Sequence, residues 1–291
     1  MAQRTDSKVT IQEALQDGLK KATNCAAIKC LHYVLEQGAD VHHLSPHWLL
    51  SSEITSTSMR EVLEILVARG FDINSESRGL PVLWYVGVGD HDHVKWCLDQ
   101  GAKVDPPDQT STEKCRPREP ILEQAAVVGD INTFELLRSK GALLDRKFGV
   151  FPKAVMAAND RVSDALEPSA RLKEKIRMLT HLLEVVGCDV NSNCHGPHYG
   201  SGSLCSTPLC WIACHPRGSN VKVLIWLLLN HGGDLDRTLE YTDQDNKLVV
   251  VHSARDAANG ISGRGIPNQQ FLEAVREWET EHCCGVSSEA G

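Results

Sequence analysis

The sequence predicts an all-α fold, a solenoid of stacked helix-turn-helix repeats with extended finger loops between them. The first observation is a short phrase that recurs six times, in which a glycine is followed two to four residues later by Asp. Its glycines stand at positions 38, 70, 101, 141, 187 and 232, at intervals of 32, 31, 40, 46 and 45 residues. The second observation is that an apolar stretch with helical periodicity precedes each glycine. Recurrence at this spacing indicates similar units that bury their apolar faces against one another.

Each element of the repeating unit has its own signal. Proline marks the start of the first helix, as in Ser45-Pro46 and Thr207-Pro208, because the first turn does not need the N–H that proline lacks. Small residues such as Ala125-Ala126 follow where two helices approach closely. The second helix shows as an apolar run such as Val221 to Leu228. The glycine then ends this helix, because it adopts the left-handed conformation without a steric clash.

Along the chain we expect a flexible leader at residues 1–9, a solenoid over residues 10–278 and a flexible tail at residues 279–291. The solenoid starts with an irregular entry repeat, whose first helix is expected at Thr10–Ala22, and ends with a degenerate seventh repeat around Ser253–Ala258 and Phe271–Trp278. The six recognisable repeats are expected to end near Asp40, Asp72, Asp105, Asp145, Asp189 and Asp234.

This repeating unit resembles the ankyrin-repeat family, whose period is about 33 residues. The stretches Leu80–Asp105 and Pro120–Asp145 carry the resemblance best, and Thr207–Asp236 matches at both ends. The chain departs from the family's Thr-Pro-Leu-His start, because Leu83 and Cys210 stand where that motif has His. The resemblance implies that fingers and first helices line a concave side, where partners usually bind.

Insertions lengthen the repeats at two kinds of place. Residues 106–118 and 192–206 lie after a finger's Asp or Asn and are expected to lengthen fingers, which adds surface on the side that binds partners. Residues 159–172 and 215–219 lie between the two helices of a repeat and are expected to be interhelical loops.

The charge argues against nucleic acid as a partner. The formal net charge is −8 and the pI is near 5.9, whereas a nucleic-acid-binding face is expected to be broadly basic. Residues 113–153 run against this trend with eight Lys or Arg against six acids, which fits either contact with an acidic partner or a solvated face.

The cysteines and the hydropathy of the chain indicate the cellular compartment in which the protein is expected. Eleven cysteines are scattered along the chain, and neither a signal peptide nor a glycosylation sequon is present. We therefore expect free thiols and an intracellular protein, cytoplasmic or nuclear. The longest apolar run, Val223–Leu229, is far shorter than the roughly 20 residues that a membrane span needs.

One cluster has residue types that suit zinc. The segment 188–215 is rich in Cys and His, and Cys194, His195, His198 and Cys205 fall in one loop. Zinc prefers these ligands, but no paired Cys-x2-Cys spacing is present. Ordinary packing and a loop without metal therefore remain the preferred interpretation, with no cofactor, and zinc stays an alternative.

Catalytic motifs are absent from the sequence. We find no phosphate-binding Gly-x4-Gly-Lys, no His-Glu-x-x-His and no Gly-x-Ser-x-Gly. The sequence thus predicts a protein that is not an enzyme and has no catalytic residues.

Candidate binding residues come from finger tips, lengthened fingers and the concave ends of first helices. Phe148 beside Lys147 is an exposed aromatic next to a cation, a composition typical of interface hot spots. Gly87, Val88, Val127 and Val128 end first helices on the concave side. The candidate protein-binding residues are Arg78, Arg116, Arg118, Lys147, Phe148, Val150, His198 and Tyr199.

These observations predict a monomeric, non-enzymatic scaffold that binds a protein partner, and neither nucleic acid nor membrane, through its fingers and concave helix surface. Two alternatives stay open. One is an enzyme or enzyme regulator with a zinc site in the 188–215 segment. The other is a shortened relative of a multidomain ankyrin protein whose effector domain lies elsewhere.

Overall fold

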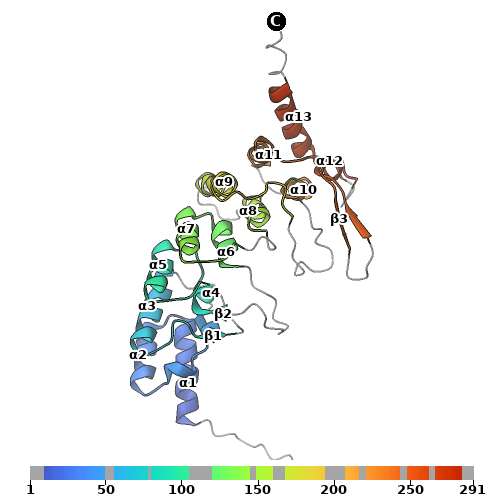
Figure 1. Cartoon of the computed structure of the whole chain (residues 1–291). Helices are drawn as coiled ribbons and strands as arrows, with labels where there is room; N and C mark the ends of the chain where they lie inside the picture. Colours follow the sequence, from blue (N-terminus) through green and yellow to red (C-terminus); the bar gives the residue numbers. More distant parts are fainter. Residues whose placement is uncertain are drawn as a thin grey trace, which may run out of the picture. The chain divides into compact units, whose positions relative to one another are not determined.

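The fold is all-α, as predicted, and consists of helix pairs joined by turns and fingers (Figure 1). A computed structural model describes residues 10–49, 56–77, 80–104, 120–144, 149–159, 168–193, 207–215, 221–242, 248–261 and 266–283. Within these ranges, no helix is both long and apolar enough to cross a membrane.

Each pair consists of a first helix and a second helix. The pairs in chain order are α1 (Ile11–Asn24) with α2 (Ile28–Glu36), η2 (Pro46–Leu49) with α3 (Ser56–Ala68), α4 (Val82–Val86) with α5 (His91–Asp99), α6 (Ile121–Val128) with α7 (Ile131–Ser139), α8 (Val150–Asn159) with α9 (Pro168–Glu184), α10 (Pro208–Cys214) with α11 (Val221–Asn230), and α12 (Ala254–Ala258) with α13 (Gln269–Cys283). A short 3-10 turn, η1 (Val41–His43), and two small hairpins, β1 (Glu76–Ser77) with β2 (Leu80–Pro81) and β3 (Leu239–Thr242) with β4 (Leu248–Val251), lie between pairs.

The chain divides into two compact units. Unit 1 comprises Met1–Cys115 and Glu135–Ala142, and unit 2 comprises Arg116–Phe134 and Leu143–Gly291. In unit 1, the first helices pack in the order α1, η2, α4, and the second helices pack in the order α2, α3, α5.

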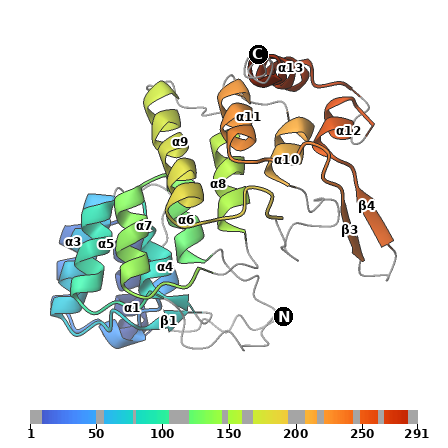
Figure 2. The same ribbon diagram turned by 45° about the horizontal axis from the view of Figure 1, so that its top comes forward.

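Unit 2 has the same two-row organisation. Its first helices pack in the order α6, α8, α10, α12, while α9 lies on α8 and α13 lies on α11. Figure 1 looks nearly along these helices and shows α8 and α10 in one row with α9 and α11 in the other, and Figure 2 shows them from the side. Fully buried side chains such as Phe151, Leu224 and Phe271 fill unit 2, and each contributes roughly 1.5–3 kcal/mol by its burial.

Helix starts follow the predicted capping chemistry. The Thr207 hydroxyl accepts a hydrogen bond from the Cys210 N–H at 3.3 Å, and Pro208 occupies the first turn of α10. Ser253 caps α12 in the same way through the Asp256 N–H, and Thr10 forms a capping box with Glu13 at α1. These side chains satisfy N–H groups that have no partner inside the helix.

The six repeated glycines all lie in the left-handed region, with φ between 76° and 95°. At Gly38, for example, the Gly38 N–H donates to Leu35 O at 3.1 Å and the Ala39 N–H donates to Val34 O at 2.9 Å. This is the Schellman pattern, which recurs at Gly70, Gly101, Gly141 and Gly232. The second helix of the fifth repeat ends differently, because the Cys188 N–H reaches Leu182 O. The glycine is therefore a helix stop, as predicted.

The structure differs from the predictions at two boundaries and in one additional element. Helix α9 begins at Pro168, inside the stretch 159–172 that was expected to be an interhelical loop. Helix α13 continues to Cys283, past the predicted end of the solenoid at residue 278. The sixth finger forms the β3–β4 hairpin, in which Leu239 pairs with Val251 and Thr242 pairs with Leu248. This hairpin was not predicted from the sequence.

Candidate protein-binding surface

Most of the predicted binding residues lie outside the part of the chain that the structure describes. These residues are Arg78, Arg116, Arg118, Lys147, Phe148, His198 and Tyr199. The alternative zinc ligands Cys194, His195, His198 and Cys205 lie outside it as well. Across the described residues, no group of three or more His, Cys, Asp or Glu side chains is arranged to hold a metal ion.

Val150 is the one predicted binding residue that the structure describes, and it requires a correction. It is the first residue of α8 and is only 4% exposed, so it belongs to the core and offers no surface to a partner. Val88, expected on the concave side, is also buried at 2% exposure. Val150 follows a finger, and Val88 follows the short helix α4. The burial of both valines depends on how neighbouring repeats cover them.

The first helices of unit 2 expose residues in one repeated register. In α10, Trp211, Cys214 and His215 are half-buried, while the intervening Ile212 and Ala213 are buried. Positions i, i+3 and i+4 share one face of a helix, so these three residues line the face of α10 that the core does not cover.

The same register recurs in the two preceding first helices. In α8 the corresponding residues are Lys153, Met156 and Ala157, and in α6 they are Gln124, Val127 and Val128. Because α6, α8 and α10 pack side by side, these nine residues form a row of matching positions on adjacent helices. We call it the first-helix strip.

The strip is largely apolar. Val128 is 42% exposed, and Val127, Met156, Ala157 and Trp211 are half-buried. The Trp211 ring stacks on the His215 ring, with centroids 3.8 Å apart and an interplanar angle of 21°. His215 Nδ1 also lies 3.0 Å from Trp211 O, so both rings are held in fixed positions.

A buried ion pair underlies the strip between α6 and α8. Lys153 Nζ lies 2.9 Å from Glu123 Oε2, and the Glu123 side chain is completely buried while that of Lys153 is 11% exposed. The charges thus neutralise each other within the helix row. The exposed part of the strip consequently keeps its apolar character.

Side chains from neighbouring elements hold the carboxyl ends of the strip helices. Asn159 Nδ2 donates to His215 O at 3.1 Å, and Lys175 Nζ donates to Ala157 O at 2.5 Å. Asn268 Nδ2 donates to Ala213 O at 3.0 Å. A helix leaves its last carbonyls without internal partners, so these contacts both satisfy them and fix one helix relative to the next.

An amide clamp joins the roots of neighbouring fingers. Asn74 Nδ2 donates to Gly101 O at 2.9 Å, and its Oδ1 accepts from the Lys103 N–H at 2.8 Å. Asn191 makes the same pair of bonds to Gly232 O at 3.0 Å and the Asp234 N–H at 2.8 Å. The Asn of the repeated phrase therefore ties one finger root to the next.

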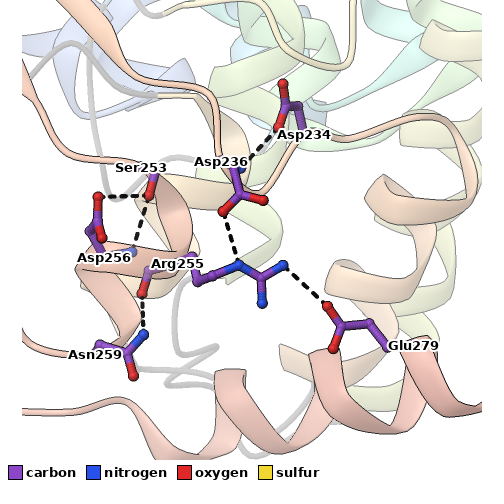
Figure 3. Close-up of polar contacts among 7 residues, drawn as sticks. All are labelled: Asp234, Asp236, Ser253, Arg255, Asp256, Asn259 and Glu279. Carbon is purple, nitrogen blue, oxygen red and sulfur yellow. Dashed lines mark hydrogen bonds and ion pairs between the residues drawn. The ribbon is translucent and has the colours of Figure 1, made fainter.

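In the sixth finger Asp236 stands where Asn would be, and an ion-pair network replaces the clamp (Figure 3). Arg255 of α12 places Nε 2.9 Å from Asp236 Oδ1 and Nη2 3.1 Å from Glu279 Oε1 of α13. The hydrogen bond to Asp236, together with that to Glu279, raises the pKa of Arg255. One side chain thus joins the last finger to both helices of the last pair.

Three of the described thiols have a pKa above the usual value of a free cysteine. A hydrogen bond with Cys214 and burial raise the pKa of the Cys210 thiol well above its usual range. Burial raises the pKa of Cys97 to about 12, and it also raises the pKa of Cys188. A nucleophilic cysteine needs a lowered pKa, so these three residues are structural.

Comparison with solved structures identifies the fold. The crystal structure of the human ASB11 ankyrin repeat domain matches with a TM-score of 0.50 and 17% identity, over 88% of this chain and 96% of that chain. No family model matches the sequence, and neither does any curated protein. Together with the helix pairs, glycine stops and fingers described above, the structural match shows that this chain has the ankyrin-repeat fold.

Proposed function

We propose that this protein is a non-enzymatic scaffold that binds a protein partner through the first-helix strip and the neighbouring fingers. The observation that carries the proposal is the contrast between the two helix rows of unit 2. The strip offers valine, methionine and tryptophan, whereas the second helices expose mainly charged residues such as Glu174, Arg177 and Lys222.

Partly exposed apolar residues at matching positions of three adjacent helices favour protein binding over simple solvation. Single exposed apolar residues are ordinary, but a contiguous patch marks an interaction site. Tryptophan is among the residues that most often dominate binding energy, and its partners cluster around it in a desolvated centre. Trp211, stacked on His215 in the same strip as Met156, has this composition.

The fold favours binding in energetic terms as well. Side-chain hydrogen bonds to the carboxyl ends of α8 and α10 and the stacking of Trp211 on His215 hold strip residues in position, so little conformational entropy is lost when a partner docks. The predicted finger residues, Lys147 and Phe148 among them, stay part of this proposal as contacts beside the strip.

Site-specific photocrosslinking in cells tests the proposal. A photoreactive amino acid replaces Val128 on the strip or, as the matched control, Val223 on α11, which is 49% exposed on the other row. We expect a discrete protein adduct from position 128 and none from position 223. Crosslinking of the same proteins from both positions, or from position 223 alone, would contradict the proposal.

A substitution then tests the anchor within the strip. Once the adduct identifies a partner, Trp211→Ala should weaken its binding about 30-fold, the effect of losing a hot-spot side chain. Val223→Ala should leave the affinity unchanged. Isothermal titration calorimetry measures both, and an unchanged affinity for Trp211→Ala would move the binding site to the fingers.

A further inference from the structure

Helix α9 differs from the other second helices in length and in charge. It spans Pro168–Glu184 and is 17 residues long, whereas α7 has nine residues and α11 has ten. Its first ten residues contain Arg171, Lys173, Lys175 and Arg177 against a single acid, Glu174, and its first turn contains no acid.

This distribution opposes helix stability. The amino end of a helix carries a partial positive charge, which favours acids in the first turn and disfavours cations. Lys173 and Arg177 stand at i and i+4, so their like charges face each other at the helix surface and cost a few tenths of a kilocalorie. A stretch that breaks local rules of this kind without a structural gain is a candidate functional site.

Two of the four cations have no structural use in the part of the chain that the structure describes. Lys175 donates to Ala157 O and so holds the end of α8. Lys173 and Arg177 are exposed, and neither forms an ion pair with a described residue. Some cations on other helices pair with acids of the same helix, as in Lys20–Asp17 and Arg138–Glu135.

We propose that the outward face of α9, formed by Lys173 and Arg177 with Arg171 beside them, binds an acidic segment of a protein partner. Opposite charge on the partner would relieve the repulsion between the two cations and speed the encounter. This surface lies on the second-helix row, so the proposal is independent of the first-helix strip.

Charge and size favour a protein segment over nucleic acid. The cations from Arg171 to Arg177 extend over only about 9 Å of helix. The chain as a whole carries −8, which would repel a long polyanion around this small basic face. A short run of Asp or Glu on a protein needs no larger basic surface.

Fluorescence anisotropy of the full chain with a fluorescein-labelled Glu-Ala copolymer peptide tests the proposal. The variant Lys173→Glu with Arg177→Glu should lower the affinity about tenfold or more. The control is Lys95→Glu with Lys103→Glu, two exposed cations of unit 1 whose replacement changes the net charge equally, and it should stay within about twofold. Binding should disappear near 1 M salt, where the screening length is about 3 Å.

The neutral variant Lys173→Gln with Arg177→Gln guards against misfolding. It should also lose affinity while its melting temperature stays at or above that of the unmodified chain, because the repulsion is removed. An equal loss in the α9 and control variants, or no binding of the peptide at low salt, would overturn the proposal. Tighter binding of duplex DNA or anionic vesicles than of the peptide at the same salt would overturn it too.

Discussion

The ion pair between Lys153 and Glu123 leads to a quantitative prediction. The two groups are 2.9 Å apart, and Glu123 is wholly buried between α6 and α8. Replacing Lys153 with Met keeps most of the aliphatic side chain but removes the ammonium group from beside the buried carboxylate. Removing one partner of a buried pair typically costs 3–5 kcal/mol, because an uncompensated charge stays in a poorly solvated site. That is a large share of the roughly 5–15 kcal/mol by which a folded domain is stable.

The double variant distinguishes this explanation from a simple packing defect. Glu123→Leu combined with Lys153→Met removes both charges, so its free energy of unfolding should return to within about 1 kcal/mol of the unmodified chain or exceed it. The surface pair Arg138–Glu135, whose side chains are 41% and 33% exposed, supplies the control. Arg138→Met should cost less than about 1 kcal/mol.

Urea unfolding monitored by far-UV circular dichroism and by tryptophan fluorescence measures these differences. Two probes are needed because repeat proteins can unfold in stages, in which case their transitions do not coincide. If Lys153→Met costs no more than Arg138→Met, or if the double variant is as unstable as the single one, the burial argument is wrong.

Two further predictions concern the finger clamp and a buried histidine. Asn74→Ala and Asn191→Ala should each lower the free energy of unfolding by about 1–3 kcal/mol, since each loses two hydrogen bonds. The control Asn132→Ala, on the surface of α7, should change it by less than about 0.5 kcal/mol. Equal effects of the three substitutions in thermal unfolding would contradict the clamp. His93 is 2% exposed, and desolvation lowers its pKa. The unfolded chain therefore binds a proton at this histidine more readily than the folded chain does. The unmodified protein should therefore lose stability relative to His93→Leu as the pH falls below about 6.5, and a stability difference that is constant between pH 7.5 and 5.5 would refute this.

The sequence predicted helix stops and helix starts well because these depend on local chemistry. A glycine in the left-handed region or a Thr-Pro at a helix start acts within a few residues, whatever surrounds it. Where prediction was wrong, a local signal had been overlooked: Pro168 suits the first turn of α9, and the run Leu248–Val251 suits a strand.

The surface was harder to predict than the helices. Val127 and Val128 were expected on the concave side, and the structure leaves both of them partly exposed. Val88 and Val150 were expected nearby and are buried, while Trp211 and His215 were not singled out at all. Their signal was the i, i+4 spacing of a tryptophan and a histidine on a first helix, but spacing alone does not distinguish a covered face from an open one.

The sequence by itself determined the repeated unit, its polarity and the ankyrin-repeat fold, since each repeat carries its own start, stop and apolar face. Only the tertiary structure decided which residues stay accessible, because a side chain is covered by the adjacent repeat, whose contribution is far away in the sequence. The tertiary structure also paired Glu123 with Lys153, joined Asn191 to the next finger, and left Lys173 and Arg177 without partners among the described residues. The contacts of Glu123 and Asn191 join residues from different repeats, and no local sequence pattern specifies them.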